Sequence, residues 1–78
     1  MNELIGAKVK YIDYLGMVED GRIIAIELLG QNEAVLHKVS NNTCWVYIQH
    51  EDPELNNKQL PDGRTYCELR LSTEIILV

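Results

Sequence analysis

The sequence predicts an all-β fold, a small five- or six-stranded barrel or roll with one long loop. Polar and apolar side chains alternate near the N-terminus, the runs that follow are rich in β-branched residues, and no helical periodicity persists over a helix of ordinary length. A chain of 78 residues supplies one hydrophobic core and too little for a second. Residues 1–78 are therefore expected to form a single domain.

The first strand is expected at residues 7–12, where Val9 and Tyr11 share one side with Ala7. A turn signal follows at Asp20-Gly21, because this dipeptide readily adopts the positive φ angles of tight turns. Residues 22–29 are nearly all apolar and rich in isoleucine, which predicts a central strand buried on both faces.

A β-hairpin is expected next, with strands at 33–40 and 43–50 around the turn Asn41-Asn42. This register divides the hairpin into two faces. The expected core face carries Val35, His37, Val39, Cys44, Val46 and Ile48. The other carries Ala34, Leu36, Lys38, Thr43, Trp45 and Tyr47. The second face is too apolar for a wet sheet face, so a partner chain, a ligand or the following segment is expected to cover it.

Residues 51–64 contain both prolines and the dipeptide Asp62-Gly63, which predicts one long loop with a helical turn near 53–56. Unstructured loops of this length are usually functional or disordered, so the loop is a candidate for activity. Two strands should complete the chain, at 65–71 and, after a Ser-Thr corner, at 74–78.

This order of elements resembles the SH3-like small barrels, which include SH3, Tudor and KOW-type domains. The resemblance covers most of residues 5–78 and implies a scaffold used mostly for binding. Trp45 lies in the middle of its strand and the long loop comes late, so proline-ligand recognition is not carried over. The chain is also acidic, unlike the KOW-type members.

Seven basic and twelve acidic residues give a net charge of −5 without a basic stripe. This balance disfavours nucleic acid and favours protein partners with basic patches. His37, Cys44, His50 and Cys67 lack the paired spacing of a zinc site, and an acid–base pair, a nucleophile or a phosphate loop is not recognisable. We expect neither metal, cofactor nor enzymatic activity.

Only two cysteines, Cys44 and Cys67, occur in the chain, which favours two reduced thiols and a cytoplasmic location over a disulfide framework. The longest apolar runs, such as 23–26 and 75–78, are far too short to cross a bilayer. Membrane association is not expected.

The aromatic residues are the strongest candidates for binding, because tyrosine and tryptophan are enriched at interface hot spots and the chain has no phenylalanine. They are Tyr11, Tyr14, Trp45, Tyr47 and Tyr66. The expected surface combines Leu36, Trp45 and Tyr47, with Lys38 stacked on Trp45. Tyr11 and Tyr14 are further candidates.

The sequence thus favours a non-catalytic protein-interaction module, one form of which is a homodimer formed through the Trp45 face. One alternative is a small acidic inhibitor or nucleic-acid mimic of the kind that phages and mobile elements encode. Another is a Tudor- or KOW-like nucleic-acid module, in which folding gathers Lys8, Lys10, Arg22 and Lys38 on one surface.

Overall fold

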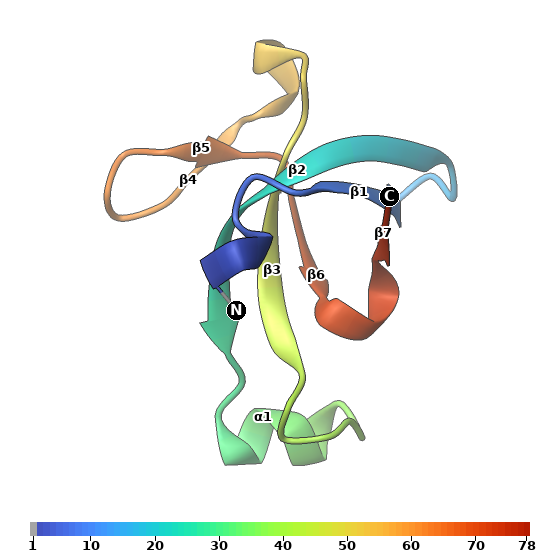
Figure 1. Ribbon diagram of the computed structural model, residues 1–78, viewed down its shortest axis with the longest axis vertical. Helices are drawn as coiled ribbons and strands as arrows, with labels where there is room; N and C mark the ends of the chain where they lie inside the picture. The colour runs from blue at the N-terminus through green and yellow to red at the C-terminus, as the bar shows by residue number, and fades with distance from the viewer. Residues whose placement is uncertain (1) are drawn as a thin grey trace.

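The computed structural model describes residues 2–78, and most of its regular structure is antiparallel β-sheet (Figure 1). The elements in order are η1 (Asn2–Leu4), β1 (Lys8–Ile12), β2 (Val18–Leu28), α1 (Gln31–Leu36), β3 (Cys44–Gln49), η2 (Pro53–Leu55), β4 (Lys58–Gln59), β5 (Thr65–Tyr66), β6 (Glu68–Leu71), η3 (Ser72–Glu74) and β7 (Ile76–Leu77). The prediction of an all-β chain is confirmed. Within the described residues, no helix is long and apolar enough to cross a membrane.

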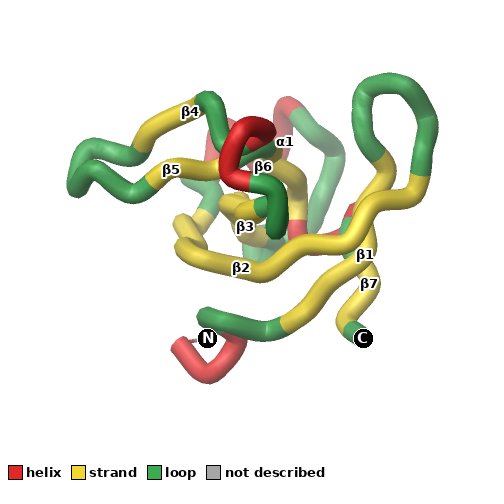
Figure 2. Tube along the Cα trace, turned by 90° about the horizontal axis from the view of Figure 1, so that it is seen from above, coloured by secondary structure: helices red, strands yellow, loops and turns green. Residues whose placement is uncertain are grey.

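The main sheet has five strands in the order β6-β3-β2-β1-β7, and it curls without closing into a barrel. Its edge strands β6 and β7 are joined by the single turn η3 (Figure 1). A second, two-stranded sheet pairs β4 with β5. Figures 1 and 2 place this small sheet and the turn between β1 and β2 at opposite ends of the molecule.

The first strand and its alternation are confirmed by β1, in which Val9 and Tyr11 are buried between exposed neighbours. With Ile23 of β2 and two residues of β3, Val46 and Ile48, they form the main core cluster. β2 is long and is the central strand of the main sheet, as predicted, but its burial does not extend to both faces along its whole length.

The turn expected at Asp20-Gly21 is wrong, since both residues lie inside β2. The chain turns earlier, where Asp13 Oδ1 accepts hydrogen bonds from the backbone N–H groups of Leu15 and Met17, both at 2.9 Å. Gly16 supplies the positive φ of 82° that this turn needs. Turn chemistry at Asp13 therefore outweighed the Asp-Gly signal.

The hairpin expected around Asn41-Asn42 is also wrong. Residues 31–36 form the helix α1 instead of a strand, and β3 pairs with β2 and β6. The Glu33 side chain accepts a hydrogen bond from the Gly30 backbone N–H at 3.2 Å, which stabilises the first turn of the helix. The asparagines do form a turn, but it connects a helix with a strand.

α1 is held by a second, smaller core cluster of Leu29, Ala34 and Leu71. Val39 and Trp45 pack against this cluster from either side of the asparagine turn. Burying Ala34 against β6 stabilises a helix too short to be stable by itself. Tertiary packing therefore overrides the β propensity of this segment.

The segment 51–64 is not one unstructured loop. The helical turn expected near 53–56 is confirmed by η2, which Asp52 caps by accepting a hydrogen bond from the Glu54 N–H. β4 then pairs with β5 and forms a short ribbon. The strand expected at 65–71 is split into β5 and β6, and β7 forms the predicted last strand after the Ser-Thr corner, which is η3.

Arg70 spans the open side of the curled sheet. Its side chain extends from β6 to the end of β1, where Nε and Nη2 donate to the Ile12 carbonyl oxygen at 3.2 and 3.0 Å. Its Nη1 atom lies 2.8 Å from the Glu68 carboxylate on the same strand. A side chain, and not a strand pair, therefore links β6 with β1.

Candidate functional site

The outward-facing side chains of β3 carry the candidate site. Cys44, Val46 and Ile48 are buried, while Trp45 and Tyr47 are half-buried on the opposite face. This division within β3 is the predicted one, although its partner strands are not. The alternation of buried and half-buried residues within β3 was therefore enough to place Trp45 and Tyr47 on the same face.

Trp45 is fixed by two neighbours from the helical segment. Its indole N–H donates to the Glu33 Oε2 atom at 2.9 Å, and the His37 ring meets it edge to face with centroids 5.3 Å apart. The indole bond and the backbone N–H of Gly30 lower the pKa of the Glu33 carboxyl below its ordinary value. The carboxylate is thus stabilised in its charged form beside the indole.

Tyr47 has an analogous arrangement one step along the strand. Its hydroxyl donates to the Glu27 Oε2 atom at 2.9 Å, and its ring meets Tyr66 edge to face with centroids 5.0 Å apart. Burial and the bond to Glu27 raise the pKa of the Tyr47 hydroxyl. Together these residues form what we call the aromatic strip. It consists of His37, Trp45, Tyr47 and Tyr66, flanked by the carboxylates of Glu27 and Glu33.

Leu36 and Lys38 do not lie on the face of the sheet as predicted. Leu36 ends α1 and is 77% exposed, and Lys38 follows with a positive φ of 58°. The predicted stacking of Lys38 on Trp45 is wrong, because the helix changes the direction of each side chain in this segment. His37, between them, makes the contact with Trp45.

Tyr11 and Tyr14 are not part of the aromatic strip, and they differ from each other in burial. Tyr11 is a core residue, only 4% exposed, with its hydroxyl 3.3 Å from the Cys67 sulfur. Burial and this contact raise the pKa of the hydroxyl. Tyr14 is 84% exposed in the turn between β1 and β2, which lies at the right in Figure 1, apart from α1 at the bottom.

A cleft of about 260 Å³, with both apolar and charged side chains in its walls, lies where the β1–β2 turn meets the segment after β3. Carboxylates of Asp13, Glu19 and Glu68 line it, and His50 Nε2 lies 3.5 Å from the Glu19 carboxylate. The other ring nitrogen of His50 accepts a hydrogen bond from the Asp52 backbone N–H at 3.0 Å. Within residues 2–78, no group of three or more His, Cys, Asp or Glu side chains is arranged to hold a metal ion.

A second, apolar groove of about 390 Å³ opens on the inner side of the sheet. Its lining consists mainly of aliphatic side chains from η1, β2, β3 and the C-terminal segment. Cys44 and Ser72 also line it. The Ser72 hydroxyl oxygen accepts a hydrogen bond from the Cys44 backbone N–H at 3.0 Å. Cys44 and Cys67 lie in different environments, the first buried and the second half-buried, and are not joined by a disulfide.

Sequence reasoning missed three residues of the aromatic strip and its flanks: Glu27, Glu33 and His37. Tyr66 was recognisable as one of few aromatic residues, but its contact with Tyr47 depends on where β5 lies. The two glutamates reach the strip only because β2 and α1 flank β3. The comparisons with known proteins found no matching family model, no similar curated protein and no similar solved structure.

Proposed function

We propose that this chain is a non-catalytic protein-interaction module whose aromatic strip binds a positively charged segment of a partner protein. The observation that carries the proposal is the pair of edge-to-face aromatic contacts flanked by two carboxylates, Glu27 and Glu33. Lysine and arginine side chains interact favourably with both aromatic faces and carboxylates.

The strip is suited to binding because its side chains are already fixed. The indole of Trp45 and the hydroxyl of Tyr47 each have a hydrogen-bond partner, so a ligand would not have to order them. Each aromatic contact with a cationic side chain contributes about 0.5–2 kcal/mol, depending on how far it is desolvated. The net charge of −5 would also attract a basic partner over a longer range.

The same surface is less suited to the homodimer expected from the sequence. A two-fold axis through the strip would bring Glu27 and Glu33 close to the same carboxylates of the second copy. Such like-charge contacts disfavour association. A cationic partner instead neutralises both carboxylates.

Trp45 is the only tryptophan, so its fluorescence reports directly on the strip. Titration with a short oligoarginine peptide is expected to change its emission, and added salt should weaken the binding. The test compares Glu27→Gln/Glu33→Gln with the control Glu51→Gln/Glu54→Gln, which removes the same charge from exposed residues near η2.

The strip variant should bind at least about tenfold more weakly than the native chain, and the control should lose much less. Equal losses in both variants would mean that only the net charge attracts the peptide. That outcome, or the absence of binding at low salt, would contradict the proposal.

A Tudor- or KOW-like nucleic-acid module is the second candidate. Lys8 and Lys10 of β1 lie on the same face as Arg22, which is paired with Lys8. Lys38, expected to join them, lies just after α1, which Figure 1 places at the bottom of the molecule and away from β1. A gel shift with single- and double-stranded oligonucleotides at low salt tests this candidate.

The assignment to the SH3-like barrels is part of the proposal. Support comes from the order β6-β3-β2-β1-β7 and from the single turn η3 between the last two strands of the main sheet. We regard the chain as an open variant of that architecture. The cytoplasmic location and the acidic-mimic alternative stay predictions.

A further inference from the structure

A second surface, distinct from the aromatic strip, lies on the outer side of the β1–β2 hairpin and β7. Its exposed apolar side chains are Ile12, Leu15, Met17, Val18 and Ile76, which are 58–70% exposed. We call these five residues the hairpin face. Because Ile12 pairs with Val18 and Ile76 pairs with Lys10, these strand residues project from the same side of the sheet.

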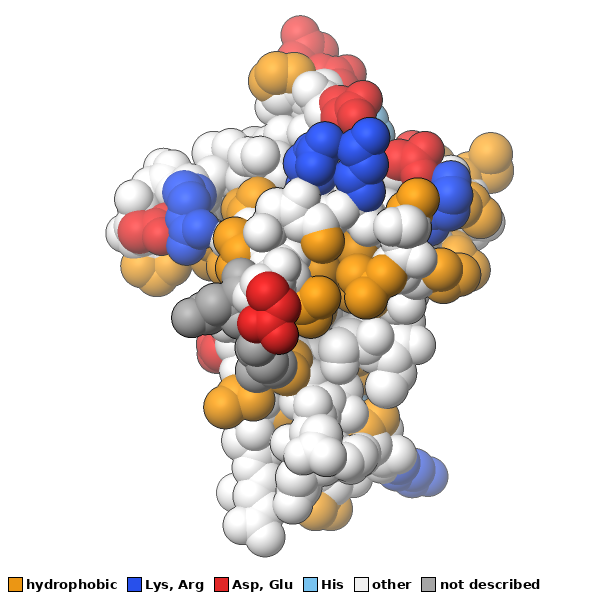
Figure 3. All heavy atoms as spheres, viewed as in Figure 1, with side chains coloured by type: hydrophobic (Ala, Val, Ile, Leu, Met, Phe, Trp, Pro, Cys, Tyr) orange, Lys and Arg blue, Asp and Glu red, His pale blue; other side chains and the backbone are white. Residues whose placement is uncertain are grey.

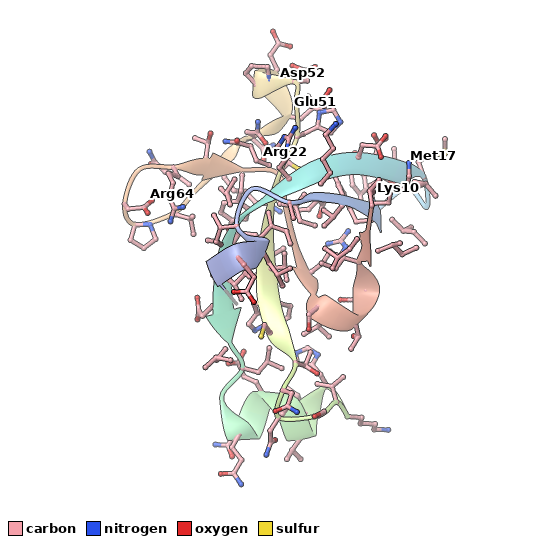
Figure 4. The ribbon with its side chains drawn as sticks, viewed as in Figure 1. Lys10, Met17, Arg22, Glu51, Asp52 and Arg64 are labelled. Atoms are coloured by element: carbon pink, nitrogen blue, oxygen red, sulfur yellow. The ribbon has the colours of Figure 1, made fainter. Side chains whose placement is uncertain are left out.

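Charged residues of both signs lie beside this face. Lys10 Nζ lies 2.8 Å from the Asp20 Oδ1 atom on the neighbouring strand. Lys8 and Arg22 continue the face away from the turn. Figure 4 shows Lys10 and Arg22 on the hairpin with Met17 near its end, and Figure 3 shows hydrophobic side chains around the basic ones. The hairpin therefore lacks the acidic excess of the whole chain.

The area exposed by the chain is large for its mass. Its solvent-accessible surface is 5451 Å², whereas a folded monomer of 8.9 kDa exposes roughly 4,800 Å². This excess belongs to the chain as a whole, and five of the thirteen large hydrophobic side chains that are exposed among the described residues belong to the hairpin face. Among the described residues, the hairpin face is a concentrated apolar part of this exposed surface.

We propose that the hairpin face binds a second copy of this chain around a two-fold axis. A homodimer needs a surface that is complementary to itself. The hairpin face meets this condition, because its apolar residues can pack on their own copies and the Lys10–Asp20 pair can exchange partners across the axis. The carboxylates of Glu27 and Glu33 on the aromatic strip are not part of it, so both surfaces can work together.

The salt dependence of binding distinguishes a second copy of the chain from other occupants of the hairpin face. Two chains of charge −5 repel each other, and salt screens that repulsion, so self-association through an apolar face should strengthen from about 20 to about 300 mM salt. Binding of an acidic protein segment, an anionic membrane or nucleic acid to Lys8, Lys10 and Arg22 would weaken over the same range.

Sedimentation equilibrium of the full chain tests the proposal. The average mass should rise from 8.9 kDa towards twice that value as the protein concentration increases from about 10 µM to about 1 mM. Leu15→Ser/Met17→Ser should raise the dissociation constant by at least about tenfold. The control Val35→Ser/Leu36→Ser alters two residues of α1 that are at least as exposed, at 72% and 77%, and should leave association unchanged.

Circular dichroism and Trp45 fluorescence verify that each variant is folded. A monomer at every concentration and salt, or equal weakening by the control variant, would overturn the proposal. So would association that weakens with salt, or hairpin-dependent binding to phosphatidylserine vesicles or oligonucleotides in the absence of dimers. Failure here would leave the oligoarginine titration of the aromatic strip unaffected.

Discussion

Gly21 lies inside β2 at a point where a methyl group has no room. A Cβ atom there would lie 2.5 Å from the Ile48 Cγ2 atom, 3.0 Å from the Gln49 carbonyl oxygen and 3.3 Å from the Tyr11 ring. Ile48 is completely buried and β-branched, so its methyl group cannot rotate away at low cost. Gly21→Ala should therefore strain the main core cluster.

The magnitude follows from two opposing contributions. Overpacking of a core costs about 1–3 kcal/mol, and contacts as short as these belong at the upper end. Replacing glycine with alanine restricts the unfolded chain and recovers about 0.4–1 kcal/mol. We expect a net loss of about 2 kcal/mol in the free energy of unfolding, which corresponds to a fall of about 8–16 °C in Tm for a domain of this size.

Urea and thermal unfolding followed by circular dichroism measure this loss. Combining Gly21→Ala with Ile48→Leu should recover part of it, because leucine has no methyl branch at Cβ. The control Ile48→Val keeps the Cγ2 atom and should not recover it. A Gly21→Ala variant within about 0.5 kcal/mol of the native chain, or equal coupling to both Ile48 variants, would refute the reasoning.

Two further predictions concern side chains that link distant segments. Because the Trp45 indole lowers the pKa of Glu33, this contact is strongest above pH 4.5 and is lost as the pH falls through the lowered value. Trp45 emission should therefore titrate with a midpoint below 4.5, and Glu33→Gln should abolish that transition; a midpoint above 4.5 would contradict it. Arg70→Gln should lower the free energy of unfolding, measured in urea, by about 2 kcal/mol, because the charged donor to the Ile12 carbonyl oxygen is lost. Arg70→Lys should retain only part of this stability, because lysine cannot donate in the same planar geometry. An unchanged free energy of unfolding in Arg70→Gln would show that the contact with β1 does not stabilise the sheet.

The parts of the fold that were predictable are those governed by neighbouring residues. Alternation identified β1 and its buried residues Val9 and Tyr11, and it separated Trp45 and Tyr47 from the core side of β3. The turn around η2 followed from Pro53, and the structure adds Asp52 as its cap. In each case the determining contacts are close in sequence.

The errors arose where distant contacts decide the structure. The segment 33–36 has a composition suited to a strand, but burial of Ala34 beside Leu71 makes it helical. Gly21 was read as a turn residue, whereas its lack of a side chain allows the close approach of Ile48. Half of the candidate site was therefore predictable, and the residues that fix it in place were not.

The bridge made by Arg70 also bears on aggregation. An open β-sheet exposes backbone groups at its edges that can pair with strands of other chains, which is the route to domain swapping and amyloid. In this protein β7 contributes only two residues to one edge, and β6 carries the charged Arg70–Glu68 pair. Short edges and charged edge residues are features that discourage such pairing. The arginine that spans the sheet would thus also protect the native chain from polymerising through its strands.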